Sequence, residues 1–202
     1  MKEERSKTES IILNAAKKVF IRKGYDGSRM QEIADEAGIN KALLHYYFRN
    51  KDTLFDAIFL EAFASFIPNI GITIMSNIPI NEKLKTIIDT YIDMLTANPF
   101  LPPFILQEIN RNPQRIVGEL QGRGLNPELF KKVLYSEIGA KSGKSIKPEH
   151  LMINIVSMCI FPFAAKPILM GFVFNHDEEK FNNFINERKQ VIYEVIVKSL
   201  EI

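Results

Sequence analysis

The stretch GINKALLHYYF, residues 38–48, combines a glycine, a polar capping residue and a short helical segment. Gly38 favours the end of a preceding helix, because glycine adopts the left-handed conformation without strain. Asn40 can cap a new helix by accepting a backbone hydrogen bond, with Ile39 and Leu44 packing across the cap. The pattern predicts a short helix that starts directly after a glycine turn.

The outward face of this short helix is unusually apolar. Successive residues turn about 100° around a helix axis, so a buried Leu44 places Ala42 and Tyr46 on the opposite face. Leu43 and His45 then lie on the flanks. A solvated face normally carries charged and polar residues, whereas this one offers small, apolar, aromatic and imidazole groups. Such groups suit base edges and thymine methyl groups in a DNA major groove.

A second amphipathic helix precedes the glycine turn. Ser28 and Gln31 have capping-box spacing at its start, and its apolar stripe consists of Met30, Ile33, Ala34 and Ala37. Two short helices joined by such a turn match the helix-turn-helix pattern, whose second helix enters the major groove. An ordinary helical hairpin is the commoner explanation, but the outward face favours DNA binding. Lys41 and Lys51 bracket that face with cations suited to phosphates.

The charge of the chain is divided unevenly. The whole 202-residue sequence has a net charge of +2, but residues 1–51 hold eleven Lys or Arg against seven Asp or Glu. The rest of the chain holds fifteen against seventeen. A basic N-terminal unit on a slightly acidic body indicates that an anionic partner meets the N-terminus.

Helical periodicity dominates the whole sequence, and no run of alternating residues predicts a strand. We expect an all-α chain of nine or ten helices, over about 6–24, 28–38, 41–48, 51–75, 81–98, 99–110, 127–139, 149–174 and 178–200. Ser6 and Glu9 have capping-box spacing at the first helix, and Asn50 can cap the fourth. Pro68 and Gly71 are expected to bend or interrupt that fourth helix.

Residues 24–59 resemble the N-terminal DNA-binding domain of the tetracycline-repressor (TetR) family, and the resemblance extends over roughly residues 8–60. The shared positions are Gly24-Tyr25, Ser28, Ile33-Ala34, Ala37-Gly38-Ile39, Leu44, Tyr47-Phe48, Lys51 and Leu54. The resemblance implies a homodimer with a helix-turn-helix domain at residues 1–50 and a ligand-binding and dimerisation domain at residues 51–202. It also implies that ligand binding releases DNA.

By position, the resemblance implies a DNA-binding set made of Ser28, Arg29, Lys41, Ala42, Leu43, His45, Tyr46 and Lys51. Within it, Ser28 and Lys51 resemble phosphate contacts at helix N-termini. His45 stands where the family usually has a phosphate-binding tyrosine. Ala42 and Leu43 also depart from the family pattern, in which glycine and then threonine or serine are usual. Lys41, Ala42, Leu43 and Tyr46 resemble the base-facing residues.

A small-molecule site is expected between residues 60 and 140, where aromatic and aliphatic side chains are mixed with a few polar groups. The expected ligand-binding residues are Phe63, Tyr91, Leu95, Phe104, Gln107, Arg111 and Tyr135. The same composition also suits a plain helical core, so the pocket rests on the resemblance. The effector it implies is a small hydrophobic molecule.

The apolar run at residues 150–174 is long enough to span a membrane. Lys166 lies well inside it, however, together with Pro162 and Pro167, and membrane spans rarely carry an unpaired lysine there. We therefore expect a buried core or interface helix rather than a membrane anchor. The resemblance to the TetR family implies that the helices at 149–174 and 178–200 form the homodimer interface.

No catalytic, metal or cofactor site is expected. The chain has three histidines and one cysteine, Cys159, and these make no metal-binding or nucleophilic constellation.

The segment GAKSGKS at 139–145 lacks the spacing of a phosphate loop and is interpreted as a linker. The acidic residues of HDEE at 176–179 suit the first turn of a helix. The polar N-terminus and the single cysteine suggest a cytoplasmic protein.

The sequence thus predicts a ligand-responsive transcriptional repressor that binds a pseudo-palindromic double-stranded DNA operator. An architectural or replication-linked DNA-binding protein of the same fold, without a ligand response, is the alternative. An enzyme built on a helical bundle is a further alternative, which the lack of a catalytic cluster disfavours.

Overall fold

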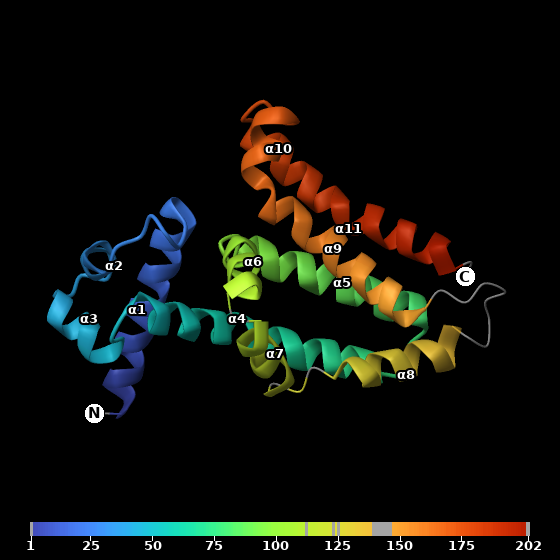
Figure 1. Cartoon of the computed structure of the whole chain (residues 1–202), viewed down its shortest axis with the longest axis horizontal. Helices are drawn as coiled ribbons and strands as arrows, with labels where there is room; N and C mark the ends of the chain where they lie inside the picture. The colour runs from blue at the N-terminus through green and yellow to red at the C-terminus, as the bar shows by residue number, and fades with distance from the viewer. Residues whose placement is uncertain (1, 112, 123, 125, 139–146, 201–202) are drawn as a thin grey trace.

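The computed structural model describes residues 2–111, 113–122, 124, 126–138 and 147–200. Within these residues the chain is entirely helical, as expected, with eleven α-helices and no strand (Figure 1). The helices are α1 (Lys2–Lys23), α2 (Met30–Glu36), α3 (Lys41–Tyr47), α4 (Lys51–Met75), α5 (Ile80–Ala97), α6 (Leu101–Arg111), α7 (Pro113–Gly122), α8 (Pro127–Ile138), α9 (Pro148–Ala164), α10 (Lys166–Phe172) and α11 (Glu178–Leu200).

Helices α1–α3 share one hydrophobic core with the first half of α4 and with α6. Its buried members include Phe20 from α1, Ile33 from α2 and Leu44 from α3. Phe55 of α4 packs its ring against Phe104 of α6, with 3.7 Å between the ring centroids. The N-terminal helices are therefore joined to the rest of the chain by packing as well as by the chain itself.

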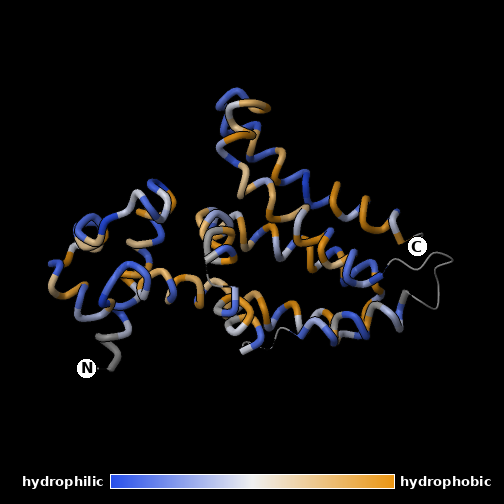
Figure 2. The backbone as a smooth tube through the Cα atoms, in the orientation of Figure 1, coloured by the Kyte–Doolittle hydropathy of each residue, from blue (hydrophilic) through white to orange (hydrophobic). Residues whose placement is uncertain are grey.

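Helix α4 extends from the N-terminal helices into the body of the protein (Figure 1). It runs without interruption from Lys51 to Met75, so the expected interruption at Pro68 or Gly71 is wrong, whereas the alternative, a bend there, stays a prediction. Hydrophobic segments recur along its length (Figure 2), and they pack first on α1 and α6 and then on α5 and α8. One continuous helix thus contacts both parts of the molecule.

The body has a second core formed mainly by α5, α9 and α11. Ile88 and Ile92 of α5 and Ile192 of α11 are fully buried there, together with Cys159 of α9. Lys83 of α5 is also buried. Its ammonium donates to the Ile74 carbonyl oxygen at 3.0 Å and lies 2.5 Å from a Glu137 carboxylate oxygen. This contact ties the end of α4 and the start of α5 to α8.

The helix caps agree with the sequence at two of four predicted positions. The side chains of Asn40 and Asn50 accept hydrogen bonds from the Leu43 and Thr53 amides, both at 2.8 Å, so these caps are confirmed. The other two predictions are wrong. Helix α1 already begins at Lys2, ahead of Ser6–Glu9. Helix α2 is capped at Arg29, whose amide donates to Glu32 at 3.3 Å, rather than by the pair Ser28 and Gln31.

The apolar run at 150–174 forms two helices instead of one. Helices α9 and α10 meet at an angle of 66° around Ala165, and Pro167 lies in the first turn of α10. By length and composition α4 could cross a membrane, but 41% of its most apolar window is buried inside the protein. Helix α7 was not predicted. The predicted linker at 139–145 lies outside the described residues.

Candidate nucleic-acid interface and ligand cavity

The turn between α2 and α3 has the geometry that the sequence predicts. Gly38 has a φ of 67°, the left-handed conformation that glycine adopts without strain. The Ile39 amide donates to the Ala34 carbonyl oxygen at 3.0 Å and closes the end of α2. The Asn40 cap then starts α3, and Leu44 holds this helix in the core with no exposed surface. The cap at Asn40 and the buried Leu44 together fix the position of α3.

The outward side chains of α3 form an exposed surface, which we call the α3 face: Lys41, Ala42, Leu43, His45 and Tyr46. The side chains of Leu43 and Tyr46 are 37% and 70% exposed. Tyr46 is held by an edge-on contact with the ring of Tyr47. The Nδ1 atom of His45 lies 3.0 Å from the Arg49 carbonyl oxygen, which restricts the imidazole. A short helix that presents apolar and aromatic tips to solvent suits base contacts in a major groove.

Lys51 is engaged inside the domain. Its ammonium donates to the carbonyl oxygens of Tyr25 at 2.7 Å and Ser28 at 3.1 Å, and approaches that of Asp26 at 3.5 Å. The same ammonium lies 4.3 Å from the centroid of the Tyr25 ring. An ammonium has three donors, and here carbonyls of the turn between α1 and α2 take them. In this structure Lys51 therefore joins that turn to the start of α4.

Ser28 and Arg29 differ in exposure. The Ser28 side chain is buried, and its hydroxyl donates to the Gly24 carbonyl oxygen. Arg29, at the N-cap of α2, is exposed. The structure therefore brings Arg29 and the α3 face to the surface of the N-terminal domain, while Ser28 and Lys51 hold its loops together.

Part of the positive charge of α1 is neutralised within the domain. Arg22 lies 2.9 Å and Lys18 3.5 Å from Glu36 of α2, and Lys23 lies 2.7 Å from Glu32. The hydrogen bond from Lys23 lowers the pKa of the Glu32 carboxyl, and that from Arg22 lowers the pKa of the Glu36 carboxyl. These pairs fasten α1 to α2 and leave the cation at the start of α3, Lys41, exposed.

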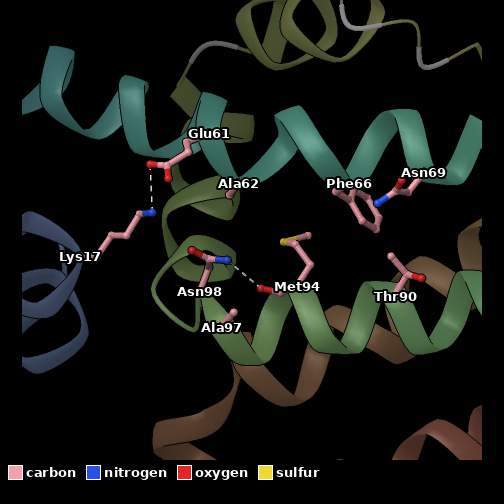
Figure 3. Close-up of a pocket in the computed structure, with 9 residues that line it drawn as sticks. All are labelled: Lys17, Glu61, Ala62, Phe66, Asn69, Thr90, Met94, Ala97 and Asn98. Atoms are coloured by element: carbon pink, nitrogen blue, oxygen red, sulfur yellow. Dashed lines mark hydrogen bonds and ion pairs between the residues drawn. The ribbon is translucent and has the colours of Figure 1, made fainter. Parts of the chain in front are cut away.

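A cavity of about 350 Å³ lies between α4 and α5 next to α1 (Figure 3). Its lining residues are Lys17, Glu61, Ala62, Phe66, Asn69, Thr90, Met94, Ala97 and Asn98. At the α1 end, the ammonium of Lys17 lies 2.9 Å from a Glu61 carboxylate oxygen. Phe66 and Met94 point into the middle of the space, and Asn69 and Thr90 lie at the other end (Figure 3). We call this space the α4–α5 cavity.

None of the predicted ligand residues whose side chains the structure describes lines this cavity. Phe63, Leu95 and Phe104 are buried in the two cores. Tyr91 is half-buried with its ring 5.1 Å from that of Phe66, and burial raises the pKa of its hydroxyl. Tyr135 is exposed. The side chains of the other two predicted residues, Gln107 and Arg111, lie outside the described residues. Lys17, Glu61 and Asn98 line the cavity but are polar, so a search for apolar and aromatic residues could not identify them as ligand-binding residues.

Comparisons with known proteins agree with this arrangement. Residues 12–58 match the family described as bacterial regulatory proteins, tetR family. The fatty acid metabolism regulator protein of Bacillus subtilis (strain 168) is 29% identical over 133 residues, which are 66% of this chain and 61% of that protein. The HTH-type transcriptional regulator RutR of Escherichia coli (strain K12) is 26% identical over 95% of this chain and 91% of its own.

The fold is also that of a solved regulator. The crystal structure of the transcriptional regulator FadR from Bacillus subtilis in complex with stearoyl-CoA superimposes with a TM-score of 0.64 and 20% identity, covering 91% of this chain and 97% of that one. Together these findings support a transcriptional regulator of the TetR family, with the family match itself confined to residues 12–58. The relatives and structural neighbours are regulators rather than enzymes, and the match over residues 12–58 makes the N-terminal helices a DNA-binding domain.

Proposed function

We propose that this regulator is a repressor that binds a pseudo-palindromic operator as a homodimer and leaves it when a small hydrophobic ligand binds. The proposal of DNA binding rests on the α3 face, where Leu43 and Tyr46 are exposed on a helix that the buried Leu44 anchors. Apolar and aromatic tips of this kind are costly on a solvated surface and useful against base edges and thymine methyl groups. Its place of action would be the bacterial cytoplasm.

The homodimer is supported by exposed apolar side chains on α9, α10 and α11 and directly after α10. They are Ile153, Val156, Phe161, Ile168, Phe172, Val173, Val191 and Val195. Phe172 is 90% exposed. Monomeric proteins rarely expose so many large apolar groups on neighbouring elements, and a two-fold contact would bury them in both protomers. Such a dimer would hold two α3 helices at a fixed spacing for two half-sites.

The ligand response is supported by the continuity of α4. This helix starts at Lys51 beside the DNA-binding helices and lines the α4–α5 cavity further along, with Ala62 and Phe66. A ligand that displaces α4 would therefore change the position of the N-terminal helices. The names of two similar proteins, a fatty acid metabolism regulator and a regulator bound to stearoyl-CoA, favour an acyl compound as effector.

Binding to the DNA upstream of the protein's own gene tests the proposal. If the protein is a ligand-released repressor, it should bind a symmetric segment of this DNA tightly. Adding an acyl ligand that binds the protein should weaken its affinity for that DNA. A ligand that binds the folded state but not the unfolded state raises the unfolding temperature by mass action, so a thermal-shift screen finds such compounds. Tight DNA binding without any ligand effect would favour the alternative, an architectural or replication-linked protein.

A further inference from the structure

The α4–α5 cavity has one charged end and one neutral end. Lys17 and Glu61 lie at the end next to α1, whereas Asn69 and Thr90 close the other end (Figure 3). Between them Ala62 and Phe66 of α4 face Met94 and Ala97 of α5, and the Asn98 amide, which donates to the Met94 carbonyl oxygen at 2.9 Å, also lines the space. A groove with a charged end and apolar side chains along its middle suits an amphiphile, a molecule with an alkyl body and a single charged head.

The sign of the head group follows from the exposure of the two charged side chains. Lys17 is 24% exposed and Glu61 is 51% exposed. A half-exposed carboxylate can exchange its partner for water at small cost, because an ion pair of this kind contributes little to stability. The ammonium of Lys17 is the more enclosed of the two and keeps a need for a counter-ion. An incoming anion can therefore take the place of Glu61.

We propose that the α4–α5 cavity binds a small acidic amphiphile, such as a fatty acid, whose carboxylate replaces Glu61 as the counter-ion of Lys17. The cavity volume of about 350 Å³ lies at the lower end of the range of about 300–1,000 Å³ for ligand sites. That volume suits an alkyl chain with a compact head and is too small to enclose a coenzyme A group as well. The inference rests on the proposed ligand-released repressor and names its ligand class and contact.

The exchange would reach the DNA-binding helices through α1. Lys18, Arg22 and Lys23 of α1 pair with carboxylates of α2, whereas Lys17 pairs with Glu61 of α4. When a ligand carboxylate takes Lys17, the α1 pairs with α2 stay intact and the ion pair from α1 to α4 is lost, while Phe20 of α1 stays packed on Phe55 of α4. The N-terminal helices would then change their orientation on α4 as one unit without leaving the shared core.

Three probes with the same alkyl chain separate the contribution of the head group: decanoate, decanol and decyltrimethylammonium. Calorimetric titration into the full-length protein should show decanoate binding more tightly than decanol, and decyltrimethylammonium binding weakest. Equal affinities for decanoate and decanol would overturn the proposal, because the charged end would then play no part. Failure of decanoate to bind at all would overturn it too.

Two variants then test the exchange, because both break the ion pair but only one removes the anion site. Lys17→Gln should lower the affinity for decanoate by about tenfold, the usual effect of one charge-assisted hydrogen bond, and leave decanol unchanged. Glu61→Gln removes the competing carboxylate, so its affinity for decanoate should stay equal or rise. A similar loss in both variants would contradict the exchange and indicate a structural effect of the ion pair.

DNA binding by the same proteins keeps the two proposals apart. If the wild-type protein binds decanoate through Lys17 but shows no preference for its upstream DNA, the repressor function fails while the ligand site stands. If DNA binding is specific and decanoate binds equally well to Lys17→Gln, the ligand site fails while the repressor function stands. Thermal unfolding of both variants checks that each is folded.

Discussion

Asn40 determines where the recognition helix begins. Its side chain accepts from the Leu43 amide at 2.8 Å, directly beside the residues that are expected to meet DNA. The cap could be predicted from the sequence because it depends on residues three apart. The role of Lys51 could not, because the carbonyls that hold its ammonium come from Tyr25 and Ser28, far upstream in the chain.

Replacing Asn40 tests how much this cap contributes. Asn40→Ala should lower the free energy of unfolding by about 1 kcal/mol, since the Leu43 amide loses its acceptor. Asn40→Asp is the matched control, because it keeps an oxygen acceptor and should cost much less. Urea denaturation followed by circular dichroism measures both. Equal stability of Asn40→Ala and the wild type would show that the cap is not needed.

Cys159 offers a second test at this scale. Burial raises the pKa of its thiol from about 9 to about 12. The raised pKa keeps the thiol neutral at pH 8, and the neutral thiol is a poor nucleophile. Iodoacetamide at pH 8 should therefore modify Cys159 slowly in the folded protein and rapidly in urea, as measured by mass spectrometry. Rapid modification of the folded protein would mean that α9 opens readily.

At the scale of helices, the all-helical character was predictable, but several boundaries, the existence of α7 and the break between α9 and α10 were not. The α2 cap lies at Arg29 because the hydroxyl of Ser28 is used by Gly24, and Glu32 rather than Gln31 accepts from the Arg29 amide. Helix α7 was missed because Gly118 lies within it and its apolar residues are few. The α4–α5 cavity was also missed, because Lys17 and Glu61 look like ordinary surface charges in the sequence.

The packing of α6 on the N-terminal helices can be tested with Phe104. Its ring contacts Phe55 and Tyr25, so Phe104→Ala should remove about 3–5 kcal/mol from the stability of this core. Hydrogen exchange should show reduced protection in α1 and α4 together. Ile192→Val, a change in the separate core of the body, is the control and should leave α1 unaffected. Protection lost in α6 alone would contradict a shared core.

At the scale of the whole molecule, the exposed apolar residues of α9–α11 predict a dimer. Sedimentation velocity at micromolar concentration should show a dimer for the wild type and a monomer for Val195→Glu, because the variant would bury an unpaired charge in the contact. Ile72→Glu changes an apolar residue on α4 that is more exposed than Val195 and should remain dimeric. A monomeric wild-type protein would count decisively against two half-sites bound by one rigid dimer.

The class of molecule was predictable from the sequence, because the pattern around residues 24–59 is specific to the family. The spatial arrangement of the ligand cavity depends on how α1, α4 and α5 pack, and no local pattern records that. The sequence therefore predicts which residues of α3 are exposed better than it predicts which residues line the α4–α5 cavity.

The most direct test is whether the α3 face distinguishes one DNA sequence from another. Affinities for the upstream DNA and for a scrambled duplex, measured at several salt concentrations, should differ among variants in two ways. Leu43→Ala and Tyr46→Ala should each lose about 1–3 kcal/mol on the upstream DNA, little on the scrambled duplex, and keep the salt slope. Lys41→Ala should weaken both duplexes alike and lower the salt slope by about 1. Equal losses on both duplexes for Leu43→Ala and Tyr46→Ala would contradict sequence reading by this face.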